Sequence, residues 1–516
     1  MSKFFPQSLT LPTSFTQRKA GTTLAFTAAM AIAAGLAGCG SNYRPTTTPI
    51  VGTGPASQPT GYMFVISKPS ASATGVGTVV DYSGDTVMAT APIGPAPETF
   101  TTNAGGSQAW ALNGDGTVSN IPVTTNLQAK QVTYSTLTPF TGTDPVVGLF
   151  AGSFGLYALD VNANQVDVLT GSPDAFKQYV PVDQSPVTMV GVSGGSRYYA
   201  ITQGIPYLTP VTIDGKSVDG GVACSIDPYA VTANGIADAV ETSSYTVSAH
   251  IQLGICPDYA LGTPDTRRIF VLNRGSDSIS VINSQNNTID SCSPGINQNG
   301  QPYTCHPSLP LTPSAGKAHA GPVYADYNGL SGQLVVANYD GNSISIIDIS
   351  LDEYGNDGPN FGKTFTIPVG NHPASVTVLA DGSRAYVANQ SDSTVSVINM
   401  VSHTVEKTLP VTGHPRTVAS ISNSLYGKVY VASPDSPYVT IIRTDQDIID
   451  TTVLTQGNAI DLRVNSPDTS ASNQHLVSRM PGAGQPCYLP PEAFAAAGAT
   501  PTIQSCKLQD ATLLVP

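Results

Sequence analysis

Residues 385–399 read AYVANQSDSTVSVIN, and the same pattern recurs along the chain. Two apolar, β-rich runs, Tyr386–Ala388 and Val395–Ile398, flank a polar turn that begins at Asn389. Two such runs around a short polar turn predict a β-hairpin. Altered copies occupy residues 269–283, 334–348 and 429–443. A hairpin that recurs along one chain indicates a repeat architecture.

The first strand of this hairpin has eight recognisable copies. Each copy has a small polar residue in fourth place, and seven begin with an aromatic residue. In order, the copies lie at residues 64–67, 110–113, 157–160, 199–202, 270–273, 335–338, 386–389 and 430–433. Four strands and their turns need ~40–45 residues, the period of a propeller blade, and most steps between copies are close to that length. The two longest steps contain four cysteines, which indicates loop insertions stapled by disulfides.

A strand led by proline precedes most of these hairpins. The clearest examples begin at His372-Pro373 and His414-Pro415. Weaker examples begin at Pro97, Pro145, Pro186, Pro257 and Pro322. The first hairpin lacks such a strand, whereas a matching strand occurs late, at Gly457–Val464. The sequence therefore predicts an all-β fold, one β-propeller of four-stranded blades over residues 59–465, in which N- and C-terminal strands together close one blade. The count gives eight blades, with seven as the alternative.

The N-terminus has the pattern of a bacterial lipoprotein signal. A basic segment ends at Arg18-Lys19, an apolar run follows, and the run ends in Leu36-Ala37-Gly38-Cys39. That tetrad resembles the lipobox, whose cysteine is lipidated and becomes the first residue of the mature protein. We therefore expect a signal peptide at residues 1–38, lipid attachment at Cys39, and a flexible tether over residues 39–58. A transmembrane anchor or an ordinary secretory signal is the alternative.

The resemblance to a lipoprotein implies a location in the cell envelope. Gly40 follows the cysteine, where an inner-membrane retention signal would carry Asp. The expected location is the outer membrane, on its periplasmic or surface face, with the lipid as the only contact with the bilayer.

Six cysteines remain besides Cys39, an even number that suits an oxidising compartment. Sequence order suggests the pairs Cys224–Cys256, Cys292–Cys305 and Cys487–Cys506, although six cysteines allow fifteen pairings. The last pair lies in residues 466–516, beyond the repeats, where we expect a disulfide-stapled cap or a tail.

The charge of the chain excludes one class of partner. Charged residues make up 11% of the sequence, and the formal net charge is −13. Binding to a phosphate backbone requires a basic face, so a nucleic-acid partner is not expected.

The strong repeats also resemble a known family. VYVAS, AYVAN and VVANYDGNSISIID are similar to the YVTN β-propeller repeat, most closely over residues 267–455. The resemblance implies a propeller, most often seven-bladed. It also brings enzymes into view, because lactonases and several quinone- or metal-dependent oxidoreductases use similar propellers.

Two local motifs suggest chemistry but have a simpler interpretation. Residues 191–195 match G-x-S-x-G, the nucleophile elbow, yet Ser193 falls between two expected antiparallel strands instead of between a strand and a helix. Asp160–Asn164 imitates the start of a calcium loop, but Gln165 replaces the required Gly. Turn chemistry explains both motifs. Trp110 holds the aromatic position of its strand and is expected to pack inside a blade.

His372 and His414 precede the proline in adjacent blades. Equivalent positions of a propeller lie on a ring about its axis, so these imidazoles and Asp144 are candidate ligands at the lip of the axial funnel. The other blades carry Gly321, Cys256 and Ser185 at this position. The alternative is that His before Pro supports the entry to the innermost strand. No cysteine or histidine spacing matches a zinc site, so no metal site or cofactor is assigned.

These observations favour a lipid-anchored module that binds or scaffolds a protein or polysaccharide of the envelope, without catalysis. The insertions at residues 203–256 and 284–322 are the expected contact surfaces. The alternatives are a propeller enzyme, either a lactonase-like hydrolase or an oxidoreductase, and a surface-layer or adhesion component. An enzyme should direct charged residues inwards from several blades. The strong repeats carry Asn, Ser, Thr and Ala at matching positions, which argues against one.

Overall fold

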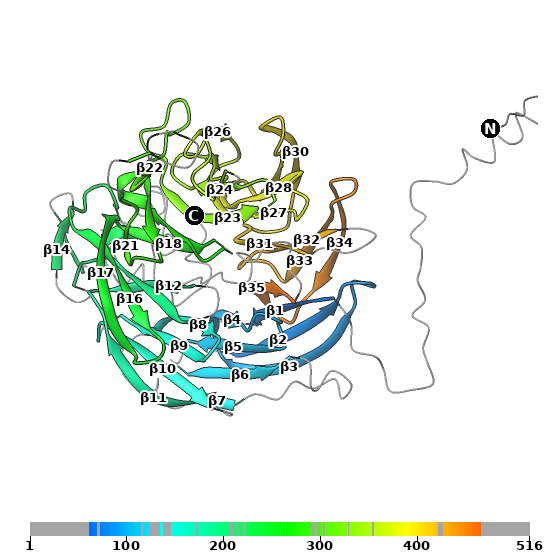
Figure 1. Cartoon of the computed structure of the whole chain (residues 1–516). Helices are drawn as coiled ribbons and strands as arrows, with labels where there is room; N and C mark the ends of the chain where they lie inside the picture. The colour runs from blue at the N-terminus through cyan, green and yellow to red at the C-terminus, as the bar shows by residue number, and fades with distance from the viewer. Residues whose placement is uncertain are drawn as a thin grey trace, which may run out of the picture. The chain divides into compact units, whose positions relative to one another are not determined.

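Eight antiparallel sheets surround a common axis in the computed structural model (Figure 1). The structure describes residues 61–465 with short internal gaps, the longest at 124–134 and 138–145. All of these residues belong to one compact unit, residues 57–516. The all-β class and the count of eight blades are confirmed, and the alternative of seven blades is wrong.

The first four blades come from the N-terminal half and from the last strand of the chain. From the axis outwards, blade 1 consists of β35 (Asn458–Val464), β1 (Tyr62–Lys68), β2 (Thr74–Asp81) and β3 (Val87–Pro95). Blade 2 consists of β4 (Pro97–Thr102), β5 (Gln108–Asn113), β6 (Val118–Pro122) and β7 (Ser135–Leu137). Blade 3 consists of β8 (Val146–Gly152), β9 (Gly155–Asp160), β10 (Gln165–Gly171) and β11 (Asp174–Pro181). Blade 4 consists of β12 (Pro186–Gly191), β13 (Arg197–Thr202), β16 (Asn234–Glu241) and β17 (Thr246–Ile255).

The remaining blades contain the strong repeats. Blade 5 consists of β18 (Pro257–Gly262), β19 (Arg268–Asn273), β20 (Ser278–Asn283) and the split outer strands β21 (Thr288–Ile289) and β22 (Ser308–Pro310). Blade 6 consists of β23 (Pro322–Asn328), β24 (Gln333–Asn338), β25 (Ser343–Asp348) and β26 (Thr364–Pro368). Blade 7 consists of β27 (Pro373–Val378), β28 (Arg384–Asn389), β29 (Thr394–Asn399) and β30 (Thr404–Pro410). Blade 8 consists of β31 (Thr417–Ile421), β32 (Lys428–Ala432), β33 (Tyr438–Arg443) and β34 (Ile448–Leu454).

A few elements lie outside the blade pattern. A small hairpin of β14 (Pro210–Ile213) and β15 (Lys216–Asp219) occupies the first insertion. Two 3-10 turns, η2 (Arg274–Ser276) and η3 (Gln390–Asp392), follow second strands. No helix in the described part of the chain is long and apolar enough to cross a bilayer.

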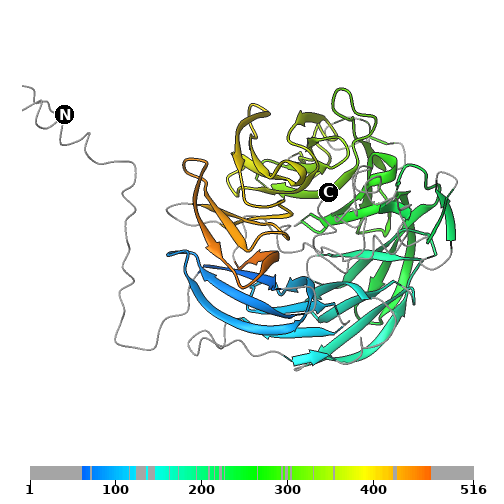
Figure 2. The same cartoon turned by 180° about the vertical axis from the view of Figure 1, so that it is seen from behind.

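The ring closes where the chain ends meet, as the sequence predicts. The late strand β35 pairs antiparallel with β1, with Val65 opposite Leu462 and Met63 opposite Val464. In Figure 2 the orange C-terminal strands accordingly lie beside the blue N-terminal ones. The innermost strands then contact one another around the whole ring, including β31 with β35 and β35 with β4. Closure gives every blade a neighbour on both sides, so the apolar faces of all blades are covered.

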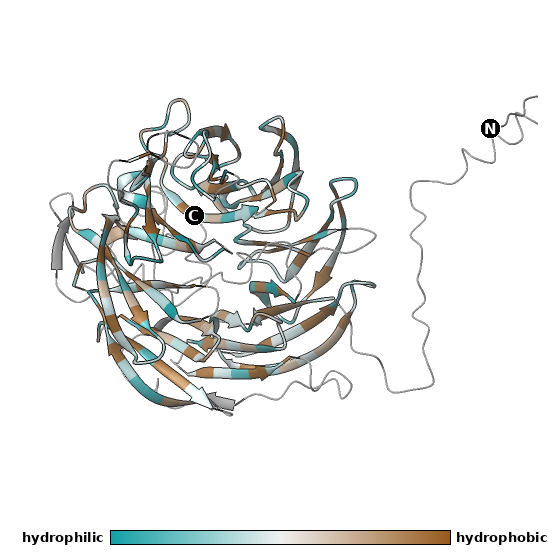
Figure 3. Cartoon of the chain, in the orientation of Figure 1, coloured by the Kyte–Doolittle hydropathy of each residue, from teal (hydrophilic) through white to brown (hydrophobic). Residues whose placement is uncertain are grey.

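The core is divided among the interfaces between blades. Hydrophobic residues concentrate on the strands, and hydrophilic residues on many of the turns (Figure 3). The largest buried cluster joins blades 5, 6 and 7 through residues such as Phe270, Val335 and Val387. Tyr386 is fully buried in the next interface, which explains the aromatic residue that opens the repeat. Trp110 packs against a blade core, as expected.

The polar residue in fourth place ties each hairpin together. Asn389 Nδ2 donates hydrogen bonds to Thr394 Oγ1 at 3.0 Å and Ser396 Oγ at 2.9 Å. Asn273 and Asn338 make the equivalent bonds across their own hairpins. The asparagine of AYVAN is therefore explained by the local geometry of the hairpin, because a buried amide must find partners.

A second recurring hydrogen bond joins neighbouring blades. In three blades the turn after the second strand contains a residue with positive φ, whose side chain accepts the amide hydrogen of the residue that precedes the next innermost strand. The donor–acceptor pairs are Ser185 with Asn164 at 3.0 Å, Gly321 with Asp277 at 2.8 Å, and His372 with Asn342 at 3.1 Å. Asp and Asn suit this place because they tolerate the left-handed conformation and carry an acceptor.

The cysteine predictions are confirmed in part. Cys224 and Cys256 form a disulfide. Cys305 is also disulfide-bonded, while its expected partner Cys292 lies outside the described residues. The signal peptide, Cys39, the tether, and residues 466–516 with Cys487 and Cys506 fall outside the described part as well, so those expectations stay predictions.

Replacing both Cys224 and Cys256 by Ser should lower the free energy of unfolding by about 2–4 kcal/mol, because the bond closes a loop of 32 residues in the unfolded chain. Urea unfolding under oxidising conditions measures the change. An unchanged midpoint would show that the insertion is held by its packing alone.

Candidate functional site

The innermost strands share an irregularity where each of them begins. In blades 1 to 7 the pairing with the second strand skips one residue, which forms a β-bulge. The skipped residue is small or apolar in most blades, but it is Glu98 in blade 2 and Asp258 in blade 5. Arg416 takes the corresponding position in blade 8, just before β31. Bulges re-aim side chains, and here they bring charged groups to the start of the axial channel.

Side chains of the inner strands connect blades 6, 7, 8 and 1. Thr417 Oγ1 donates to Asp461 Oδ1 at 2.9 Å, and Thr377 and Ser420 share a hydrogen bond of 2.8 Å. Asp326 Oδ2 accepts the amide hydrogen of Val378 at 2.8 Å. Each of these bonds crosses from one blade to the next, so the inner strands of these four blades form a polar belt.

Arg463 lies within this belt and contacts the neighbouring blade 2. Its Nη1 donates to Asp461 Oδ1 at 2.8 Å, and its guanidinium lies 5.1 Å from the centre of the Phe100 ring. Burial raises the pKa of Tyr259, and Arg463 opposes that rise; it acts on Tyr324 in the same sense. The two tyrosines belong to blades 5 and 6, whereas Arg463 belongs to blade 1. The positive charge of Arg463 thus acts on groups of blades 5 and 6.

Arg416 differs from the buried arginines Arg274 and Arg463, each of which pairs with an aspartate. Its residue is 3% exposed, and its side chain makes no hydrogen bond or ion pair with any described residue. Burial lowers its pKa to about 10, while Asp461 and Glu98 act in the opposite direction. Glu98 lies two blades from Arg416 in the ring. Its effect on the pKa of Arg416 indicates that the guanidinium faces the axis. A buried guanidinium without acceptors is costly, which makes this position the strongest candidate for a ligand contact.

A second polar network covers the same end of blades 5 and 6. Arg274, only 1% exposed, donates two hydrogen bonds of 2.9 Å to Asp340. Tyr229, from the first insertion, donates to Asp340 at 2.8 Å and stacks on His319 with ring centres 3.5 Å apart. Burial alone would lower the pKa of Arg274, but Asp340 outweighs burial and raises it. The stapled insertion is thus fastened to the propeller through a buried ion pair.

The two candidate histidines are held by their own surroundings. His372 has a φ of 52°, its Nδ1 lies 2.6 Å from Ser391 Oγ, and its ring stacks on Tyr339 at 4.5 Å. Burial lowers its pKa, partly offset by the Asp340 carboxylate. His414 Nδ1 lies 2.7 Å from Asp435 Oδ2. These contacts fit the interpretation that each histidine supports the entry to an innermost strand. Asp144 lies outside the described residues.

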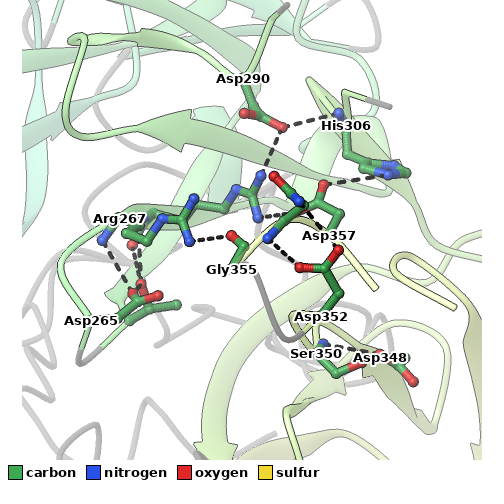
Figure 4. Close-up of polar contacts among 12 residues, drawn as sticks. Asp265, Arg267, Asp290, His306, Asp348, Ser350, Asp352, Gly355 and Asp357 are labelled. Atoms are coloured by element: carbon green, nitrogen blue, oxygen red, sulfur yellow. Dashed lines mark hydrogen bonds and ion pairs between the residues drawn. The ribbon is translucent and has the colours of Figure 1, made fainter. Parts of the chain in front are cut away.

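The second insertion is tied to a loop of blade 6 (Figure 4). Arg268 Nη1 lies 2.5 Å from Asp357 Oδ1, and its Nη2 lies 3.5 Å from Asp290 Oδ2. His306 donates its amide hydrogen to Asp290 at 3.1 Å, and Arg267 bonds to the Gly355 carbonyl oxygen. These charges satisfy one another, so the cluster explains how the insertion is fixed and offers little to an outside ligand.

The structure bears on both motifs with a simpler interpretation. Ser193 is not among the described residues, but the flanking strands β12 and β13 pair antiparallel, which is not the strand–turn–helix of a nucleophile elbow. Asn164 has a φ of 53°, and Asp160 Oδ1 accepts the amide hydrogen of Ala163 at 2.9 Å. The turn interpretation of Asp160–Asn164 is confirmed.

The charged residues of the axis were missed by the sequence analysis. We expected Asn, Ser, Thr and Ala at inward positions, yet Asp326, Arg416, Asp461 and Arg463 meet there from three blades. A comparison of the residues that follow each leading proline would have singled out Glu98, Asp258 and Arg416. One group outside the axis can hold a metal ion among the described residues: Asp183, Asp238 and His250.

Comparisons with known proteins show the fold of this chain but not its family or its activity. No family model and no curated protein matches the sequence. A crystal structure of AztD from Citrobacter koseri is 14% identical, with a TM-score of 0.50, over 78% of this chain and 97% of that chain. The dihydro-heme d1 dehydrogenase NirN in complex with DHE is 13% identical, with a TM-score of 0.49, over 81% and 78%. The chain is an eight-bladed β-propeller. At such low sequence identities, the structural likeness carries no information about activity.

Asp340→Ala should lower the free energy of unfolding by about 3–5 kcal/mol, because it leaves Arg274 buried without its counter-ion. The double variant Arg274→Met/Asp340→Leu should be less destabilised, since it removes both charges. Asp445→Ala is the control, because Asp445 pairs with Arg443 near the surface and should matter by less than about 1 kcal/mol. Equal urea midpoints for Asp340→Ala and Asp445→Ala would contradict this role.

Proposed function

We propose that this protein is a lipid-anchored binding module of the cell envelope, which binds a carboxylate group of a protein or polysaccharide partner at Arg416 in the axial channel. The observation that carries the proposal is the buried guanidinium of Arg416, which has no acceptor among the described residues. The fold supports it in a general way, because a closed propeller offers a rigid channel and exposed loops on one scaffold.

The chemistry of Arg416 favours a planar oxyanion. A guanidinium presents its donors as a flat fork that matches a carboxylate with two parallel hydrogen bonds. Asp461 Oδ1 accepts hydrogen bonds from Arg463 and Thr417, and Asp461 Oδ2 accepts none, so no direct bond joins Asp461 to Arg416 among the described residues. Asp461 and Glu98 also limit the negative charge that the channel accepts. A single carboxylate fits this balance better than a polyanion.

A second unsatisfied group lies on the opposite side of the ring. Gln203 in blade 4 is fully buried, and neither atom of its amide has a hydrogen-bond partner in the described part of the chain. It directly follows β13, the place that Arg274 occupies after β19 in blade 5. The stapled first insertion, which contributes Tyr229, lies at the same end. A partner that enters from this end would meet the insertion first and Arg416 deeper in the channel.

The envelope location rests on the sequence. The tetrad Leu36–Cys39 supports lipid attachment at Cys39, and the disulfide Cys224–Cys256 is consistent with an oxidising compartment. The likeness of the strong repeats to the YVTN β-propeller repeat supports membership of that group. The outer membrane remains the location we propose, with a protein or polysaccharide of the envelope as partner.

A propeller enzyme is the second candidate, because charged residues do converge on the axis from several blades. Its weak point is the pairing of Asp461, which is bound to Arg463 and Thr417 and is poorly placed to transfer protons. Turnover of lactones or of a quinone by the purified chain, lost in Asp461→Asn, would favour this candidate over binding.

Arg416→Met should weaken partner binding without destabilising the fold. Loss of a charge-assisted contact of about 2–5 kcal/mol predicts at least a ~30-fold weaker interaction. The immobilised chain would be used to recover partners from envelope extracts, with excess acetate as a competitor. Recovered protein and carbohydrate are then quantified separately. Arg443→Met, a change of the same type near the surface of blade 8, is the control.

The stability of Arg416→Met also tests whether the Arg416 guanidinium lacks an acceptor in the free protein. Removing a buried unpaired charge should leave the urea midpoint unchanged or raise it. If Arg416→Met unfolds more readily by about 2 kcal/mol or more, the guanidinium is a structural group. If it also recovers partners as the wild type does, the proposed binding role is refuted.

Cys39→Ser should move the protein from the membrane fraction to the soluble envelope fraction, because a lipid anchor would be lost. Labelling with a radioactive fatty acid measures lipidation directly, and Cys224→Ser is the control for loss of a cysteine elsewhere. Incorporation of label into Cys39→Ser would rule out this attachment site.

A further inference from the structure

Three side chains with metal-binding atoms meet in blade 4, far from the axial channel. Asp238 belongs to β16 and His250 to β17, the two outer strands, where they face each other across the pairing. Asp183 belongs to the connection between β11 and β12, which leads from blade 3 into blade 4. Asp183 and His250 are 67 positions apart in the sequence, and only the fold brings them together.

The contacts among these three residues are short. His250 Nδ1 lies 2.8 Å from Asp183 Oδ2 and 2.6 Å from Asp238 Oδ1. One ligand atom from each residue lies within 4.8 Å of both others. The backbone amide of Asp183 donates to the second oxygen of Asp238 at 2.7 Å, which fixes that carboxylate and leaves Oδ1 directed at the group.

A single hydrogen on His250 Nδ1 cannot bond to both carboxylates. The Nδ1 of an imidazole carries at most one hydrogen, and its geometry allows a hydrogen bond to Asp183. Asp238 Oδ1 therefore lies 2.6 Å from the nitrogen without a hydrogen bond, although the Asp238 side chain is 0% exposed. A buried carboxylate oxygen in that position needs a cation.

No lysine or arginine adds to the charge that His250 can offer. Neither Asp183 nor Asp238 forms an ion pair with a lysine or an arginine in the described chain. A divalent ion would offset the repulsion between the two carboxylates.

We propose that Asp183, Asp238 and His250 bind a divalent transition-metal ion of the Zn²⁺ or Mn²⁺ type, through His250 Nδ1 and one oxygen of each carboxylate. Mixed imidazole and carboxylate ligands suit these ions better than Ca²⁺, which prefers oxygen alone. Zinc lies ~2.0–2.2 Å from such ligands, so the three atoms would separate slightly on binding. The His250 side chain is 61% exposed and is free to make that shift.

The protein supplies fewer ligands at the proposed site than the ion needs. Three protein ligands leave at least one position open on a tetrahedral ion, and His250 lies at the surface. Such a site binds its ion in contact with solvent, where water or a donor from a partner takes the remaining position. It is separate from Arg416 and does not depend on the function proposed for the axial channel.

Calorimetric titration of the chelator-treated full chain with Zn²⁺, and separately with Mn²⁺, tests the site. We expect one equivalent of either ion to bind, and His250→Ala to weaken binding by at least ~10-fold. Asp183→Asn should weaken it as well. His403→Ala is the matched control, since His403 packs on Phe365 and takes no part in the group.

Each result of the metal titration either supports or overturns the proposed site. His250 is exposed, so His250→Ala should fold normally, which circular dichroism checks. Absence of binding by both ions in the wild type would overturn the proposal. So would binding that survives His250→Ala unchanged, because the ion would then lie elsewhere. Anomalous diffraction from a crystal soaked in Mn²⁺ should place the ion beside Asp238.

Discussion

The pairing of β35 with β1 is the contact on which the other sheets depend. Each blade buries its apolar faces against two neighbours, so a ring that failed to close would expose blade 1 and blade 8 together. The same strand carries Asp461 and Arg463 to the axis. Closure of the fold and assembly of the charged belt are thus one event, because both require the last strand to reach the first. A chain that ended before β35 would lose its channel as well as its ring.

Charged groups can lie at the start of an innermost strand because the innermost strands of blades 1 to 7 contain a bulge there. A regular strand would alternate its side chains strictly between the two faces of the blade, and both faces are packed with apolar residues. The extra residue breaks that alternation at one point and lets Glu98 and Asp258 leave the apolar faces, and Arg416 lies just before the paired part of β31. In most other blades the same position holds a small or apolar residue, which costs nothing to bury. The charged positions are therefore exceptions to the repeat and mark where the blades differ in chemistry.

The sequence predicted what depends on local pattern. Eight hairpins, the closing strand and the Cys224–Cys256 bond all follow from periodicity and from cysteine order, and all are present. The axial charges were not predicted because they lie on the innermost strands, whose copies resemble one another weakly. The repeat pattern is clear only in the hairpins. The group around His250 escaped for a different reason: its members come from a connection and from two strands of an atypical blade, and their register is a property of the fold. Proximity of that kind has no signature in spacing.

Two buried arginines show how a structural charge differs from a functional one. Arg274 and Arg416 both lie within the ring and are almost fully covered. Arg274 has Asp340, bound through two hydrogen bonds, so its burial holds the first insertion on blades 5 and 6. Arg416 has no such bond in the described structure, so its burial opposes folding and contributes nothing to it. A methionine or leucine would fill the same space at a lower free energy. A bound acceptor would supply the hydrogen bonds that Arg416 lacks, which is why we propose a ligand at Arg416 and none at Arg274.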